Sequence, residues 1–175
     1  MRRAQHATPA IGLFAVLFGL WAFAVVPAAG AMEWKHWNEG LQEAQKSGKP
    51  MLVDVYTDWC GWCKRMDAEV YAKPEVSGYL ERHFVTVRLN AESTEQATWQ
   101  GHTYSSRSLA SSFDVSGYPT TIFFDTAGAH LANVPGYIPR ERFMLLLRFI
   151  GDGHMARNES FDEYMKQAQA AHPAP

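Results

Sequence analysis

The sequence is poor in cysteine, since its 175 residues contain only Cys60 and Cys63. Exported proteins that depend on disulfides for stability usually contain several cysteines, whose bridges close long loops. A bridge between these two residues would close a very short loop and would constrain the unfolded chain little. We therefore expect the pair to serve chemistry rather than stability.

The sequence also lacks a strong charge of either sign. Its 16 basic and 18 acidic residues leave a formal net charge of −2, which indicates neither a nucleic-acid-binding surface nor a strongly acidic tail. Neither internal repeats nor low-complexity tracts occur in it. The apolar fraction of 47% suits one compact domain with a buried core, which we expect to be monomeric and without a nucleic-acid partner.

The N-terminal segment has the order of a secretory signal peptide. Arginines at positions 2 and 3 precede an uncharged apolar run over residues 11–26, and a run of small residues ends at Ala31. We predict that residues 1–31 are a cleaved signal peptide and that the protein is periplasmic. The alternative is an uncleaved membrane anchor, although the run is shorter than the roughly 20 residues that a spanning helix needs.

Periodic patterns predict an α/β domain over residues 32–153 and a helical tail over residues 154–175. Helices are expected over residues 33–47, 63–71, 74–82, 105–113, 140–150 and 160–171, and strands over residues 51–56, 84–89, 120–124 and 130–134. The first two strands should be parallel, because a helix joins them, and the last two should form a hairpin. Residues 90–104 are polar and unpatterned, so we expect a loop there. The element order predicts a central mixed sheet of about four to five strands flanked by helices.

The two cysteines lie at the junction between a predicted buried strand and a helix. A disulfide exchanger needs a thiolate, an adjacent thiol that resolves the mixed disulfide, and room for the partner's sulfur. The free N–H groups at a helix N-terminus favour the thiolate of Cys60, and Cys63 lies one turn inside on the same face. We therefore assign Cys60 as the attacking residue and Cys63 as the resolving residue.

A zinc site is the alternative for this pair, because Cys-x-x-Cys is also half of many tetrahedral sites. Two further ligands at suitable spacing would be needed, but the histidines are scattered and no two of them form a His-x₃₋₅-His pair. We therefore expect no metal, and no cofactor other than the redox-active disulfide Cys60–Cys63.

Asp54 lies six residues before Cys60, between two valines of the predicted strand. A carboxyl group buried there should have a raised pKa, which would allow it to take or deliver the proton of Cys63 during exchange. The alternative is an ordinary polar residue that reaches water near the end of the strand.

Aromatic residues near the dithiol are candidates for binding a polypeptide substrate. Trp59, Trp62 and Tyr118 could form an apolar rim around the sulfurs, although Trp59 could instead belong to the core. We also assign Gly61, between the cysteines, and Thr120, at the start of the third strand, to the substrate-binding residues.

Two segments resemble the thioredoxin superfamily. Residues 53–64, with Trp-Cys-Gly-Trp-Cys-Lys, resemble its active-site segment, and residues 115–120, with Gly-Tyr-Pro-Thr, resemble its cis-proline loop. By itself an X-Pro bond before a strand indicates only a turn, since about one in twenty such bonds is cis. The resemblance implies a thioredoxin fold, a cis bond before Pro119 beside the dithiol, and a buried carboxylate at Asp54. More narrowly, residues 34–164 resemble exported thioredoxin-like proteins of the SoxW kind, and less closely the C-terminal domain of the transmembrane reductase DsbD.

Motif and export together predict a periplasmic thiol:disulfide oxidoreductase. We expect a dithiol reductase that takes electrons from a membrane thiol carrier and passes them to oxidised cysteines of exported proteins. The alternatives are a disulfide oxidase or isomerase on the same fold, and a module that binds peptides or metal without turnover.

Two departures from thioredoxin limit what the resemblance implies. A tryptophan, residue 62, stands where thioredoxin has proline, so thioredoxin's strength as a reductant does not carry over. Residues 92–107 also form a longer segment than in thioredoxin. Its Trp99, His102 and Tyr104 either contact partners or belong to a variable surface loop.

Overall fold

The structure of the protein is a computed structural model that describes residues 32–171. The predicted signal peptide, residues 1–31, lies outside the described residues. The central sheet contains β1 (Met51–Tyr56), β2 (Val85–Asn90), β5 (Thr120–Phe124) and β6 (His130–Pro135). Their order is β2-β1-β5-β6, with β1 and β2 parallel and β5 antiparallel to both of its neighbours. The predicted mixed sheet, its parallel pair and its hairpin are confirmed.

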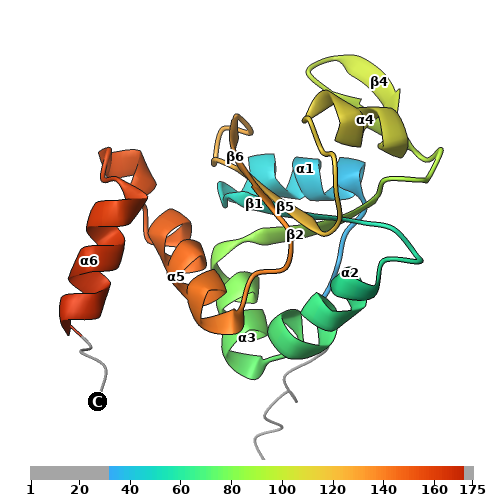
Figure 1. Ribbon diagram of the computed structural model, residues 1–175. Coiled ribbons are helices and arrows are strands. Elements are labelled where there is room, and N and C mark those ends of the chain that lie inside the picture. Colours follow the sequence, from blue (N-terminus) through green and yellow to red (C-terminus); the bar gives the residue numbers. More distant parts are fainter. Residues whose placement is uncertain (1–31, 172–175) are drawn as a thin grey trace, which may run out of the picture.

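Helices cover both faces of this sheet, as Figure 1 shows. One face carries α1 (Trp37–Ser47) and α4 (Ser106–Ser112). The opposite face carries α2 (Gly61–Met66), its π-helical continuation η1 (Asp67–Tyr71), α3 (Pro74–His83) and α5 (Arg140–Gly151). The arrangement is a three-layer α/β/α sandwich, as predicted for a thioredoxin fold.

Burial on both sides explains the apolar run of β1. Met51, Val53 and Val55 pack in the cluster under α1, whereas Leu52 packs in the cluster on the opposite face. Successive side chains of a strand point to opposite faces, so a strand covered on both sides needs apolar residues at consecutive positions. Asp54 shares the face of Leu52 and is the exception to the pattern.

The first predicted helix begins later than expected. Residues 33–47 show helical spacing, but the backbone of Lys35 pairs with β2 at the edge of the sheet. Its N–H donates to the Thr86 carbonyl at 3.0 Å, and its carbonyl accepts from the Arg88 N–H at 3.0 Å. Residues that pair with a strand cannot be helical, so the prediction that the helix includes residues 33–36 is wrong.

The predicted loop over residues 90–104 contains a β-hairpin, so that prediction is wrong. The strands β3 (Gln96–Trp99) and β4 (His102–Ser105) pair antiparallel and form a separate two-stranded sheet. The two residues of the turn, Gln100 and Gly101, have φ values of 49° and 78°. A two-residue turn with positive φ at both positions matches the right-handed twist of a hairpin.

Helix α1 holds this hairpin against the domain. The Asn38 side chain donates to the Gln96 carbonyl at 2.9 Å and accepts from the Thr98 N–H at 2.7 Å. The indole N–H of Trp37 donates to the Thr98 carbonyl at 2.9 Å. Ala97 is fully buried between the hairpin and the core. The hairpin is therefore an integral part of the domain.

The C-terminal segment is helical and packs on the domain. A 3₁₀ turn, η2 (Met155–Arg157), leads to α6 (Phe161–Ala171), which lies beside α5 (Figure 1). The rings of Phe161 and Tyr164 lie 5.2 Å and 5.5 Å from the ring of Phe149 on α5. No helix within residues 32–171 is long and apolar enough to cross a membrane.

Candidate active site

The cysteine pair lies where the chain leaves β1 and enters α2. Cys60 is the N-cap of α2, and its backbone N–H donates to the Thr57 carbonyl at 3.1 Å. Cys60 and Cys63 are joined by a disulfide, with their Cα atoms 5.3 Å apart. The helix begins at Gly61, two residues before the predicted start, because Cys60 itself caps it.

The backbone of α2 favours negative charge on the sulfur of Cys60. Cys60 Sγ accepts a hydrogen bond from the backbone N–H of Cys63 at 3.0 Å. Helix α2 continues directly into η1, so its N-terminal N–H groups add the positive end of a longer dipole. In the reduced protein the same N–H groups would favour a thiolate at Cys60.

The carboxyl group of Asp54 lies on the face of the sheet that carries α2 and η1, and it is 1% exposed. Its Oδ2 accepts from Arg88 Nε at 3.2 Å, and its Oδ1 accepts from the Tyr71 hydroxyl at 3.4 Å. Arg88 also pairs with Asp67 at the start of η1. The arginine therefore bridges one buried carboxylate and one that is partly exposed.

Burial outweighs this pairing in setting the protonation of Asp54. Desolvation raises the pKa of Asp54 to about 6, while the positive charge of Arg88 opposes the rise. The carboxyl group is then mostly ionised at neutral pH and close enough to its pKa to exchange a proton.

Arg88 was not among the residues selected from the sequence. It stands opposite Asp54 in the register of β2 with β1. Its guanidinium lies 4.8 Å from the Trp34 ring centroid and 4.9 Å from that of Tyr56. The alternation of side chains along β2 predicts that Arg88 lies on one face of the sheet. Only the register of β2 with β1 shows that Asp54 lies on the same face.

The loop before β5 has an unusual backbone. The peptide bond between Tyr118 and Pro119 is cis. The Pro119 carbonyl accepts from the Gly136 N–H at 2.8 Å, which ties this loop to the end of β6. The Thr120 hydroxyl donates to the Gly117 carbonyl at 2.8 Å, and its side chain is buried. Thr120 therefore braces the loop, and its side chain does not reach the surface expected to bind substrate.

Trp59 and Tyr118 form the first of two aromatic pairs near the disulfide. Their ring centroids lie 6.0 Å apart with an edge-to-face angle of 78°. The indole N–H of Trp59 donates to Glu92 at 3.0 Å, so the segment before the hairpin fixes this ring. Trp59 is 67% exposed and does not belong to the core.

Trp62 and Tyr137 form the second aromatic pair, with ring centroids 5.6 Å apart. The guanidinium of Arg65 lies 5.2 Å from the centroid of each ring, a cation–π arrangement. The Tyr137 hydroxyl donates to Glu69 at 2.7 Å, and Arg65 pairs with the same carboxylate at 3.0 Å. These hydrogen bonds hold the pKa of Glu69 below its ordinary value. Tyr137 was not among the predicted site residues.

The disulfide itself is largely covered, whereas its aromatic neighbours are not. Cys60 and Cys63 are each 4% exposed, but Trp62 is 55% exposed. A side chain added at Gly61 would meet no atom within 4 Å, so the surface is open at that point. The site presents aromatic surface around a nearly buried disulfide.

A family described as a thioredoxin-like domain matches residues 37–151 of the chain. The chain belongs to this family. The thioredoxin-like domain therefore covers the sheet, the cysteine pair and the cis-proline loop.

Curated relatives point in the same direction. The thioredoxin-like domain is similar to thiol:disulfide interchange protein DsbD of Pectobacterium atrosepticum, with 32% identity over 105 residues, and to that of Escherichia coli K12, with 34% over 113 residues. These matches cover 59% and 63% of this chain but only 17% and 18% of the relatives. The chain therefore spans less than a fifth of the length of these relatives.

Two solved structures share the fold. A thioredoxin from Thermus thermophilus superposes with a TM-score of 0.60 and 28% identity, over 74% of this chain and 95% of that one. A thioredoxin-fold protein from Helicobacter pylori superposes with a TM-score of 0.63 and 24% identity, over 71% and 82% of the two chains. Family membership and the disulfide at the start of α2 make this chain a thiol:disulfide oxidoreductase. Its narrower likeness to proteins of the SoxW kind stays a prediction.

Proposed function

We propose that the protein is a periplasmic dithiol reductase that acts on disulfides of exported proteins. The observation that carries the proposal is the placement of the cysteines, with Cys60 capping α2 and receiving the N–H of Cys63. Buried Asp54, whose pKa is about 6, supports thiol–disulfide exchange at this site, because it can serve as a base for the second thiol. The apolar run and small residues before position 32 support export.

In the first step the Cys60 thiolate attacks one sulfur of the client's disulfide. A bond forms between Cys60 Sγ and that sulfur, and the client's other sulfur leaves as a thiolate that takes a proton from water. The N–H groups at the start of α2 hold the attacking sulfur ionised before the client arrives.

In the second step Cys63 resolves the mixed disulfide. Its thiol loses a proton to the Asp54 carboxylate, its sulfur bonds to Cys60 Sγ, and the client's second sulfur leaves as a thiolate. The client has then gained two electrons, and the Cys60–Cys63 disulfide has formed. A membrane thiol carrier would return the two electrons and complete the cycle.

The aromatic pairs suit a polypeptide client. Trp59 with Tyr118 and Trp62 with Tyr137 present apolar and aromatic surface near the cysteines. Aromatic surface of this kind contributes strongly to protein recognition at a low cost in conformational entropy. A client would therefore pack against the tryptophans to bring its disulfide to Cys60.

Trapping tests the mechanism. We expect purified Cys63→Ser protein to accumulate a mixed disulfide with insulin, because its Cys60 can attack but cannot be resolved. The matched Cys60→Ser variant should accumulate none. Non-reducing electrophoresis and mass spectrometry of the adduct measure both results. Equal binding of insulin by both variants, with no covalent adduct from either, would support a module without turnover and refute the proposal.

The direction of the reaction is tested by equilibrating the protein with glutathione buffers. A reductase should have a potential nearer the roughly −270 mV of thioredoxin than the roughly −120 mV of a strong periplasmic oxidant. A potential near the second value would instead favour the oxidase alternative.

A further inference from the structure

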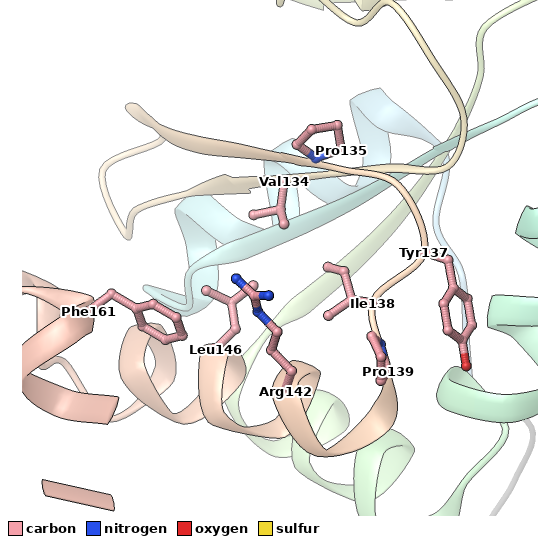
Figure 2. Close-up of a pocket in the computed structure, with 8 residues that line it drawn as sticks. All are labelled: Val134, Pro135, Tyr137, Ile138, Pro139, Arg142, Leu146 and Phe161. Atoms are coloured by element: carbon pink, nitrogen blue, oxygen red, sulfur yellow. The ribbon is translucent and has the colours of Figure 1, made fainter. Parts of the chain in front are cut away.

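A groove lies between the end of β6, α5 and α6, beyond the aromatic pairs. Its volume is about 380 Å³, which is within the range of ligand sites. We call it the α5 groove, and its walls include Val134, Ile138, Pro139, Arg142, Leu146 and Phe161 (Figure 2). The α6 helix contributes Phe161, so the helical tail completes one wall.

The α5 groove reaches the aromatic pair beside the cysteines. Pro135 lines the groove and is paired with Thr120 where β6 meets β5. Thr120 is the residue that follows the cis-proline. Tyr137 also lines the groove, and it packs against Trp62 beside the cysteines. A chain that leaves the disulfide along Tyr137 therefore enters the groove.

Arg142 is the one charged side chain among the residues that line the groove. Figure 2 shows it extending from α5 toward Val134 on β6. Within residues 32–171 it forms no salt bridge, whereas Arg140 on the same helix pairs with Glu75 and Glu141. An exposed guanidinium over an apolar floor fits a ligand that carries one carboxylate beside an apolar side chain.

We propose that the α5 groove binds an extended segment of the client polypeptide that flanks its reactive cysteine. The segment places an apolar side chain on Leu146 and Phe161 and an acidic side chain on Arg142. This inference rests on the proposed function, and it assigns the helical tail a role in choosing clients. Reduced protein should then react faster with disulfides in an apolar and acidic sequence context.

The probes are synthetic peptides with one cysteine, joined through a disulfide to a small coloured aromatic thiol. In one series a Leu-Glu pair stands on either side of the cysteine, and the peptides differ in the number of residues, about two to six, between the pair and the cysteine. Each of these residues spans roughly 3.3 Å when the peptide is extended. Matched series carry Ser-Gln or Leu-Lys. Pre-reduced protein, freed of reductant, reacts with each probe in a single turnover, and release of the coloured thiol gives the second-order rate constant.

We expect the Leu-Glu probe at one spacing to react about fivefold faster than its Ser-Gln counterpart. Arg142→Glu should abolish that advantage and transfer it to the Leu-Lys probe. The control variant Arg148→Glu, which changes an exposed arginine of α5 outside the groove, should behave as wild type. Circular dichroism verifies that both variants fold.

The outcomes separate this inference from the proposed function. Failure of wild-type protein to react even with the free aromatic disulfide would remove the proposed function. If wild-type protein reacts with all probes at the same rate, whatever their spacing, flanking residues or charge, only the proposed role of the groove is overturned. Sedimentation could instead show that the wild-type protein is a dimer and that Arg142→Glu is a monomer. The groove would then bind a second copy of the chain, and the inference would also be overturned.

Discussion

Replacing Asp54 with asparagine should stabilise the protein, and the gain should grow with pH. In the folded protein the Asp54 carboxyl group has a pKa of about 6, whereas in the unfolded chain its pKa is near the ordinary value of 3.8. Between these values unfolding releases a proton, so raising the pH favours the unfolded state. Wild-type stability should therefore fall across this window, and asparagine removes the effect because it does not ionise.

The size of the effect follows from the two pKa values. They differ by about 2, and each pKa unit corresponds to about 1.4 kcal/mol, which gives about 3 kcal/mol at neutral pH. Arg88 keeps its pairing with Asp67 in the variant, so its charge is not left alone. The stability difference should be small near pH 4, should rise to roughly pH 6.5 and should then stay constant.

Urea unfolding of the oxidised proteins, followed by circular dichroism at constant ionic strength, measures this difference. The Asp58→Asn variant, which removes a carboxylate from an exposed position, serves as the control for net charge. A stability gain in Asp54→Asn that does not change between pH 4 and pH 8, or that shrinks as pH rises, would refute the reasoning.

Two further changes test the neighbourhood of β2. Arg88→Met removes the positive charge that opposes ionisation, so the pKa of Asp54 should rise further, by roughly 1–2. The pH profile of insulin reduction should move in the alkaline direction by the same amount, and an unmoved profile would separate Asp54 from proton transfer. Gly40→Ala places a methyl group against Val87 in the core and should cost about 1–3 kcal/mol in urea unfolding. The control is Gly78→Ala on α3, where the new methyl group would lie 3.3 Å from Nη1 at the end of the flexible Arg82 side chain, which can move. It should be neutral or stabilising, and equal effects at both glycines would contradict the packing argument.

Elements whose signal lies within a few residues could be predicted from the sequence. The β1 strand matches its predicted bounds, because six consecutive residues without helical period indicate a strand covered on both faces. The β5 strand does so for the same reason. The cysteine pair was placed correctly at the junction of strand and helix, since that junction follows from the end of one pattern and the start of the next.

Features that depend on contacts between distant segments could not be predicted in the same way. Each strand of the β3–β4 hairpin has four residues, which is too short to show a clear alternation. Its position depends on Asn38, about 60 residues earlier, whose side chain pairs with both Gln96 and Thr98. The ion pair between Arg88 and Asp54 likewise requires the register of β1 with β2, which α2, η1 and α3 separate along the chain.

The pairing of Lys35 with β2 also affects how readily the protein aggregates at high concentration. The β2 strand lies at the edge of the sheet, where unpaired backbone groups can recruit a strand from another molecule. Lys35 already occupies the Thr86 carbonyl and the Arg88 N–H on that side, and its ammonium pairs with Glu33, Glu39 and Glu43. A second molecule would have to displace this segment before it could extend the sheet. Protection against aggregation through this edge is therefore set by the first residues of the folded domain.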